Sequence, residues 1–296
     1  MRIAVTGATG FVGRVLVNAL IERGDEVVAI SRNPERARHL LPLIAAHHSS
    51  EDLRGALEGA DAVVHLAGET VVGRWSEEKK RAIRDSRVEG TRALVDALAG
   101  LERRPQALIS ASAIGFYGDR NDEDCTEDAG PGADFLATTS VEWENEAARA
   151  TDFGLRVVSL RIGIVLGTGG GALDAMLLPF KLGAGGPLGS GQQWWSWIHI
   201  QDAVRMLLTA IDEPWSGSYN ATAPYPERQK DFARILGRTL NRPAILPAPG
   251  FALKVILGEF ATELLNGKRV IPERAREAGF RFEFERLDDA LADLIG

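Results

Sequence analysis

The chain has 296 residues, of which 45% are hydrophobic and 25% are charged, and its formal net charge is −7. This composition is typical of a globular protein with a large buried core, arranged as one large domain or as one domain plus a smaller one. The acidic charge, with no cluster of Lys and Arg, argues against a nucleic-acid surface, so a small molecule is the expected partner.

Disulfide bonds and membrane insertion are also not expected. Cys125 is the single cysteine, so no internal disulfide can form. The first predicted strand begins at Arg2 and leaves no room for a signal peptide. No apolar run approaches the roughly 20 residues of a membrane span. We therefore expect a cytoplasmic protein that makes no contact with a membrane.

The chain opens with a predicted strand, a glycine-rich turn and a helix. Apolar or small residues at 3–6 indicate a buried strand, and Phe11 to Arg23 has helical periodicity. Between them, Gly7 and Gly10 suit a tight turn that exposes backbone N–H groups, and Gly13 lets the helix pack closely on the strand. This context predicts a dinucleotide site with the pyrophosphate at the helix start. The alternative is a turn that merely needs glycines.

The second predicted strand, Glu26 to Ile30, is followed by Ser31-Arg32-Asn33-Pro34. In dinucleotide-binding folds an acid at this point accepts from the ribose 2′-hydroxyl of NAD(H), whereas an arginine accommodates the 2′-phosphate of NADP(H). Arg32 is present and no acid occurs before Glu35. The sequence therefore favours NADP(H), with a solvated surface arginine as the alternative.

Further strands and helices continue the alternation. Leu43 to Ala46 is predicted as a short third strand, and Asp61 to Gly68 as a fourth that ends at the ligand crevice of a parallel sheet. His65 within it is predicted to be a packed core histidine rather than a catalyst. Ser76 is expected to cap a helix that runs to about Ala99.

The fifth predicted strand, Gln106 to Ser110, leads into a loop that contains Ser112 and Tyr117. Hydroxyls at the carboxyl end of a strand are well placed to hydrogen-bond a substrate carbonyl. A helix from Phe135 to Thr151 follows, with three glutamates in its middle that predict a polar face and one inward acid. The acidic loop before this helix lacks the spacing of a calcium site, and we expect no metal.

The second half of the chain is less regular. Glycine-rich stretches at 167–171 and 183–187 predict flexible or substrate-covering loops. Asp202 is expected to cap a helix over Ala203 to Ile211, and Phe251 to Leu265 is a predicted apolar helix.

Three tryptophans, Trp194, Trp195 and Trp197, stand close together in this half. They indicate either an apolar or planar substrate component or simply part of the core. The substrate itself is not indicated.

At least six strands alternating with helices predict an α/β fold with a doubly wound parallel (Rossmann) sheet. We expect residues 1–162 to form the dinucleotide-binding domain, with 196–222 returning to the sheet. Residues 163–195 and 223–296 are expected to form a smaller C-terminal substrate-binding lobe.

Four motifs occur together: Gly7-Ala-Thr-Gly10-Phe-Val-Gly13, His65-Leu-Ala-Gly68, Val88-Glu-Gly90-Thr91 and Ser110-Ala-Ser112-Ala113. With them, the chain resembles an extended short-chain dehydrogenase/reductase of the NAD-dependent epimerase/dehydratase type. Further signatures are Ser110 to Gly118, Phe135-Leu136 with Trp143-Glu144, Leu257-Gly-Glu259, Gly267 to Pro272 and Ala278-Gly-Phe280. Through these it is similar, over almost its whole length, to the atypical SDR39U-like subgroup of epimerase family proteins.

The resemblance implies an NADP(H) site along the carboxyl edge of the sheet. Backbone N–H groups at the first turn would hold the pyrophosphate, Arg32 the 2′-phosphate, and residues after the fourth to sixth strands the nicotinamide. The residues assigned to this site are Gly7, Thr9, Gly10, Phe11, Val12, Arg32, Leu66, Ala67, Gly68, Ser110, Arg161, Gly163 and Ile164.

The resemblance also implies a catalytic Ser and a Tyr-x-x-x-Lys pair, in which the Tyr transfers a proton. Ser112 matches the first, but no Tyr-x-x-x-Lys occurs in the chain. If Glu144 is aligned with the acid that commonly follows the family's Lys, Leu136 and Ser140 take the positions of the Tyr and the Lys. The usual family mechanism is therefore not carried over.

Three functions remain open. The first is an NADP(H)-dependent oxidoreductase in which Ser112 polarises a substrate oxygen and Tyr117 donates a proton. The second is a regulatory protein that binds NADP(H) without turnover, since the subgroup includes proteins named for a cell-division inhibitor. The third is a nucleotide-sugar epimerase. Extended members of this fold commonly pair, so a homodimer is also open.

Overall fold

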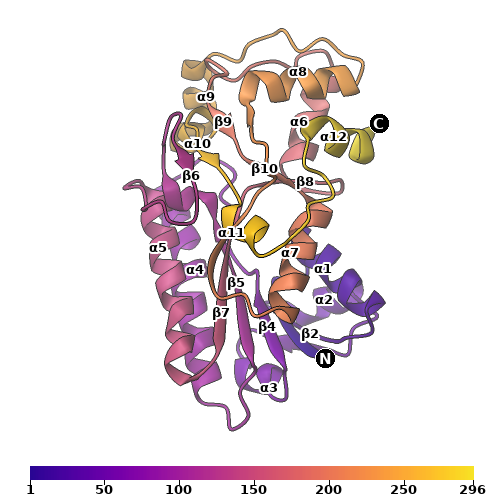
Figure 1. Ribbon diagram of the computed structural model, residues 1–296, viewed down its shortest axis with the longest axis vertical. Helices are drawn as coiled ribbons and strands as arrows, with labels where there is room; N and C mark the ends of the chain where they lie inside the picture. Colours follow the sequence, from indigo (N-terminus) through magenta and orange to yellow (C-terminus); the bar gives the residue numbers. More distant parts are fainter.

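Seven parallel strands form the central sheet of the structure, a computed structural model that describes residues 1–296 (Figure 1). The strand order is β11-β7-β5-β4-β1-β2-β3, and every neighbouring pair is parallel. The strands are β1 (Arg2–Thr6), β2 (Glu26–Ser31), β3 (Ala46–Ser49), β4 (Ala62–His65), β5 (Ala107–Ala113), β7 (Arg156–Ile162) and β11 (Gly217–Ala221). The predicted doubly wound parallel sheet is confirmed.

Helices cover both faces of this sheet. On one face lie α1 (Phe11–Glu22) and α7 (Ile200–Asp212). On the other lie α3 (Leu53–Leu57), α4 (Glu77–Ala99) and α5 (Phe135–Ala148), while α2 (Pro34–Leu40) connects β2 to β3. Ser76 begins α4 as predicted, because its Oγ accepts a hydrogen bond of 3.1 Å from the backbone N–H of Lys79. None of the helices is both long and apolar enough to cross a membrane.

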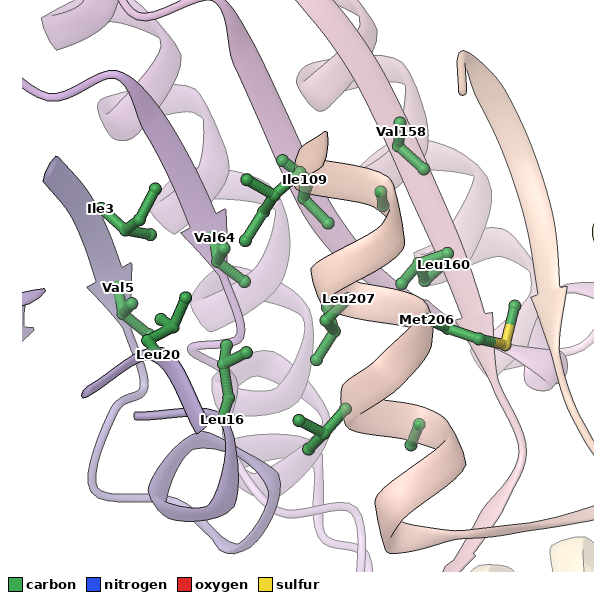
Figure 2. Packing of buried hydrophobic residues seen from close by; sticks show 14 of the residues in the cluster. Ile3, Val5, Leu16, Leu20, Val64, Ile109, Val158, Leu160, Met206 and Leu207 are labelled. Atoms are coloured by element: carbon green, nitrogen blue, oxygen red, sulfur yellow. The ribbon is translucent and has the colours of Figure 1, made fainter. Parts of the chain in front are cut away.

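Figure 2 shows the core between the sheet and the α1/α7 layer. Leu16 and Leu20 of α1 and Leu207 of α7 pack with Val5 and Val64 of the strands, within a cluster of 27 buried apolar residues. Full burial of one such side chain contributes roughly 1.5–3 kcal/mol. This packing holds the carboxyl ends of β1 and β4 in a fixed position, and the candidate site lies at these ends.

The remaining elements follow β7, apart from β6 and the short helices η1 and η2. Helices α6, α8, α9 and α12 gather at the upper end of the molecule in Figure 1, beyond the main sheet. The helices are α6 (Gly171–Lys181), α8 (Gln229–Thr239), α9 (Gly250–Leu257), α10 (Ala261–Leu265), α11 (Glu273–Glu277) and α12 (Leu287–Ile295). The 3-10 helices are η1 (Ile114–Tyr117), η2 (Arg149–Phe153) and η3 (Gly258–Phe260).

Three two-stranded sheets connect these elements. They pair β8 (Ile164–Leu166) with β10 (Trp197–His199), β9 (Trp194–Trp195) with β12 (Glu227–Arg228), and β6 (Asp124–Cys125) with β13 (Arg269–Val270). From β10 the chain returns to the main sheet through α7 and β11, which pairs with β7.

The third strand lies later in the chain than predicted, at Ala46–Ser49 instead of 43–46. It is an edge strand that pairs only with β2, and its centre is His47 and His48, so it carries no apolar run. Leu43, which suggested the earlier position, is 80% exposed. An apolar pattern marks buried strands and fails at a polar edge.

Two helix predictions were also wrong. Asp202 does not cap α7; the helix begins earlier, and Nδ1 of His199 accepts a hydrogen bond of 3.1 Å from the backbone N–H of Gln201. Asp202 is fully buried and accepts instead from the backbone N–H of Glu283 at 3.0 Å. The predicted helix over 251–265 is divided into α9 and α10, because Gly258 adopts a left-handed φ of +62° that ends α9.

Candidate functional site

The turn between β1 and α1 presents unpaired backbone donors. Gly10 is the N-cap of α1, without a side-chain hydrogen bond to the helix end. The backbone N–H groups of Phe11, Val12 and Gly13 have no acceptor within the protein. Together with the partial positive charge of a helix N-terminus, free donors of this kind bind phosphate groups.

Glycine is required at this turn for steric reasons. Gly7 has a φ of +71°, and a Cβ there would lie 2.7 Å from the backbone carbon of Leu66. A Cβ on Gly13 would lie 2.2 Å from the carbonyl oxygen of Gly7. The backbones of β1, β4 and α1 therefore meet without side chains between them, as the motif predicts.

A cavity of about 610 Å³, called the first cavity below, extends from this turn along the carboxyl ends of β1, β2 and β4. Seven of the residues assigned from the sequence line it: Gly7, Thr9, Gly10, Arg32, Leu66, Ala67 and Gly68. Apolar side chains from α2, α3 and α4, among them Leu40, Leu53 and Leu94, line the cavity as well. Its walls thus combine backbone donors, cations and an apolar surface.

Two arginines lie where β2 ends and α2 begins. Arg32 and Arg36 both line the first cavity. Glu35, the nearest acid in sequence, points elsewhere and pairs with Arg38 at 2.8 Å. The acid that does line the cavity, Glu69, binds Lys79 at 2.7 Å, and this hydrogen bond lowers its pKa.

His65 is a core residue, as predicted. Its Nδ1 lies 2.6 Å from Oγ1 of Thr6 and its Nε2 lies 2.9 Å from Oγ1 of Thr91. Burial lowers the pKa of His65 to about 4, so the ring is neutral at physiological pH. Because Oγ1 of Thr6 also accepts from the backbone N–H of Ala67 at 3.3 Å, the ring helps to order the floor of the first cavity.

A second cavity, of about 390 Å³, adjoins the first beyond Gly10 and Gly68. Three assigned residues, Phe11, Gly163 and Ile164, line it. So do Leu136 and Ser140, which take the positions of the family's Tyr and Lys if Glu144 is aligned with the family's acid. The lining is mainly apolar and includes Ala113, Phe260, Leu264, Trp194 and Trp195. Trp197 is instead fully buried in the core, and Trp195 belongs to the same buried cluster although it also lines the cavity.

Three charged side chains line the second cavity: Arg87, Glu263 and Lys268. Nζ of Lys268 lies 3.3 Å from Oε2 of Glu263, and the two side chains are only 8% and 17% exposed. They form an ion pair on the cavity wall. Sequence reasoning missed all three, although Lys268 follows Gly267 in a subgroup motif and Arg87 directly precedes the Val88 motif.

Phe11 directly follows the glycine turn between β1 and α1, and its side chain lines the second cavity. A Cβ on Gly171 would lie 2.7 Å from its ring, one on Gly167 would lie 2.9 Å away and one on Gly170 would lie 3.0 Å away. The ring therefore fills space that three glycines leave open between β8 and α6. This explains part of the glycine-rich stretch predicted as a loop.

Ser112 lies in a buried polar network and lines neither cavity. Its Oγ donates to Oε1 of Glu144 at 2.6 Å. Nε and Nη2 of Arg161 donate to the two oxygens of the same carboxylate at 2.8 Å each. Glu144 is thus the predicted inward acid of α5.

Tyr117 belongs to the same network. Its hydroxyl donates to Oδ1 of Asn220 at 2.7 Å and accepts from Nη1 of Arg161 at 3.0 Å. The side chain is fully buried, and burial raises the pKa of Tyr117 to about 12. This position does not favour the proton-donor role predicted for Tyr117, and the hydroxyl of Ser112 is engaged by Glu144.

Two residues assigned to the cofactor site from the sequence, Ser110 and Arg161, lie away from both cavities. Ser110 is buried and its Oγ donates to the carbonyl oxygen of Ala111, while Arg161 stacks on Phe116 with its guanidinium carbon 3.4 Å from the ring centroid. Ser110 lies within β5 and Arg161 within β7, and side chains along a strand alternate between the two faces of the sheet.

A parallel sheet whose first turn offers free N–H groups to a cavity along its carboxyl edge defines an NAD(P)-binding Rossmann protein. The comparisons with known proteins agree with this class. The chain belongs to the NAD dependent epimerase/dehydratase family, whose model matches residues 3–222. Residues 248–294 match a domain of unknown function, DUF1731.

Similar proteins occur in plants and bacteria. The chain is 42% identical over 304 aligned residues to the chloroplastic epimerase family protein SDR39U1 homolog of Arabidopsis thaliana, covering 100% of this chain and 87% of that protein. It is 38% identical to the epimerase family protein YfhF of Bacillus subtilis over 298 aligned residues, covering 100% and 98%. The SDR39U-like resemblance is therefore confirmed.

Solved structures agree with the fold. The structure of human epimerase family protein SDR39U1 with NADPH is 34% identical, with a TM-score of 0.92 and coverage of 100% of this chain and 99% of that one. A nucleoside-diphosphate sugar epimerase from Corynebacterium glutamicum is also 34% identical, with a TM-score of 0.80, but this chain covers only 58% of it.

Proposed function

We propose that this protein binds NADP(H) and is an oxidoreductase that interconverts a carbonyl and an alcohol. The observation that carries the cofactor choice is the pair Arg32 and Arg36 on the lining of the first cavity, with no free acid beside them to accept from a ribose 2′-hydroxyl. A 2′-phosphate is the group that two guanidiniums bind best. The NADPH in the similar human structure supports this choice.

The residues of the first cavity fit a dinucleotide. The free N–H groups of Phe11, Val12 and Gly13 would hold its pyrophosphate. The apolar side chains of Leu40 and Leu53 would cover the adenine. The nicotinamide end would then reach the junction of the two cavities near Gly68.

Reaction chemistry would take place in the second cavity. A bound NADPH would supply the hydride for carbonyl reduction. Lys268 lines this cavity and pairs with Glu263. Its Nζ would donate a proton to the substrate oxygen. Glu263 would hold the side chain of Lys268 in position through their contact of 3.3 Å. In this proposal Ser112 and Tyr117 belong to the supporting framework.

Two measurements test the proposal. Calorimetry should find tighter binding of NADPH than of NADH to the purified protein. NADPH deuterated at C4 should transfer its label to the product of a carbonyl library, detected by mass spectrometry. NADH binding equal to or tighter than NADPH binding would contradict the cofactor assignment, and NADPH binding without label transfer would contradict the oxidoreductase assignment.

A regulatory protein that binds NADP(H) without turnover is the second candidate. It is favoured by the absence of a Tyr-x-x-x-Lys pair from the chain and by Leu136 and Ser140, the positions aligned with that pair, on the wall of the second cavity. Binding of NADPH with no label transfer to any carbonyl compound is the result this candidate predicts. The nucleotide-sugar epimerase alternative is less favoured, because the second cavity is lined mainly by apolar side chains.

A further inference from the structure

Arg87 is the charged residue on the lining of the second cavity that no carboxylate neutralises. Its Nη1 donates to two backbone carbonyl oxygens, those of Glu69 at 2.9 Å and Ile83 at 3.1 Å. The side-chain carboxylate of Glu69 does not pair with it but with Lys79, at 2.7 Å. Arg87 therefore has no carboxylate within ion-pairing distance, and Glu69 acts on it only as a more distant charge.

The guanidinium of Arg87 is held in one place. Its central carbon lies 5.2 Å from the centroid of the Trp143 ring, and a Cβ on Gly68 would lie 3.3 Å from it. A group confined between an aromatic ring, a glycine and two carbonyls loses little freedom when it binds a ligand. Burial lowers the pKa of Arg87 to about 10, so the side chain remains charged at neutral pH.

The charge of Arg87 sets the net charge on the lining of the second cavity. Besides Arg87, its charged residues are Lys268 and Glu263, which pair with each other and sum to zero. The net charge on the lining is therefore +1, within mainly apolar walls. A cation with a low-dielectric surrounding and no paired carboxylate favours an anionic ligand, and a planar guanidinium matches the two oxygens of a carboxylate.

We infer that the substrate of this protein has an apolar body and a carboxylate, and that Arg87 binds the carboxylate. This inference rests on the function proposed above and names its substrate class. Arg87 lines the second cavity and not the first, which favours a substrate group over a cofactor phosphate as the anion. The apolar body would lie against Leu136, Phe260 and Leu264.

The test compares acids with their amides as probes. Benzoate, phenylacetate, benzamide and phenylacetamide are titrated by ligand-observed NMR, with and without saturating NADPH. We expect each acid to bind about tenfold or more tightly than its amide, the effect of one charge-assisted bidentate contact. Arg87→Gln should abolish this preference, and Arg87→Lys should retain part of it.

Arg84→Gln is the matched control. Arg84 lies one turn earlier on α4, pairs with Glu142 at 2.7 Å and lines neither cavity, so this variant should keep the full preference for acids. Equal binding of acids and amides by the unmodified protein would overturn the inference. So would an Arg87→Gln protein that keeps the preference for acids but loses NADPH affinity, since Arg87 would then serve the cofactor. NADPH affinity, measured separately, shows whether the cofactor assignment stands regardless of this result.

Discussion

Glu144 and Arg161 form a bidentate ion pair inside the protein, with two N–H···O contacts of 2.8 Å and side chains that are only 12% and 6% exposed. Ser112 and Ser218 donate to the same carboxylate. The pair joins α5 to β7. We expect Glu144→Gln to lower the free energy of unfolding by about 3 kcal/mol, because it leaves a buried guanidinium without its counter-charge.

Chemical denaturation measures this loss, and Glu142→Gln is its control. Glu142 lies two residues earlier on α5 and pairs with Arg84 on the surface, with both side chains about 40% exposed. Such a surface pair contributes less than about 1 kcal/mol. Equal losses in the two variants would show that the buried pair has no special weight.

Variants of Tyr117 and Lys268 should distinguish a structural role from a catalytic role. Tyr117→Phe removes the hydrogen bonds to Asn220 and Arg161, so we expect a loss of stability of about 1–3 kcal/mol with NADPH binding unchanged.

Lys268→Met should instead reduce label transfer from NADPH to the carbonyl product by about 100-fold or more, since it removes the proposed proton donor. If Tyr117→Phe abolishes transfer and Lys268→Met does not, the roles are reversed.

Arg32 is predicted to select the cofactor. Arg32→Asp removes a charge-assisted contact with a 2′-phosphate and should cost about 1.5–3 kcal/mol of NADPH binding, roughly 10- to 150-fold in Kd. NADH has no such phosphate, so its Kd should change much less. Arg38→Gln is the control for calorimetry, because Arg38 lies on the following helix α2, pairs with Glu35 and does not line the cavity. Equal losses for both cofactors in Arg32→Asp would exclude the 2′-phosphate contact.

Much of the nucleotide half could be predicted from the sequence. The glycine turn at Gly7, Gly10 and Gly13 and the arginine after β2 could be recognised from the sequence. The conformation of a turn and of the helix after it is determined by residues that are neighbours in the chain. The same locality explains the correct assignment of His65 and of the helix after Ser76. The edge strand β3 was misplaced because its residues are polar and their pairing with β2 is a tertiary property.

The second cavity could not be predicted in the same way. Arg87, Leu136, Gly163 and Lys268 come from segments far apart in the chain and meet only in the folded protein. Ser112 and Tyr117 show the converse. A matching motif suggested a catalytic role for Ser112, and a place in the neighbouring loop suggested one for Tyr117, but the fold directs both side chains into a buried network. Spacing in a sequence does not indicate which face of a strand borders a cavity.

Gly13 allows a direct test of the close packing at the cofactor turn. In Gly13→Ala the new Cβ would lie 2.2 Å from the carbonyl oxygen of Gly7, so α1 must move away from β1. We expect a loss of about 1–3 kcal/mol in the free energy of unfolding and weaker NADPH binding. Gly100→Ala, at the end of α4 with its closest neighbour 3.6 Å away, should change stability by less than about 1 kcal/mol. A Gly13→Ala protein with unchanged thermal unfolding would contradict this account.

His65 predicts a particular dependence of stability on pH. Its pKa is about 4 in the folded protein and 6.5 in a free side chain, so between these values the unfolded chain binds the additional proton. Stability should therefore fall as the pH drops from about 6.5 toward 4, by up to about 3 kcal/mol from this residue. Denaturation of the unmodified protein and of His65→Gln at pH 5, 6 and 7 measures the difference. Parallel pH profiles would remove His65 as a cause.

The ring of Phe11 lies between the glycine turn after β1 and the second cavity. It follows the glycine at the phosphate-binding turn, and it is also a wall of the second cavity, pressed against Gly167, Gly170 and Gly171. A side chain added at any of these glycines would push on the ring and so on the turn beside it. Substitutions that reshape the second cavity from this side should therefore disturb nucleotide affinity at the same time, and efforts to broaden its ligand range should begin at the opposite wall.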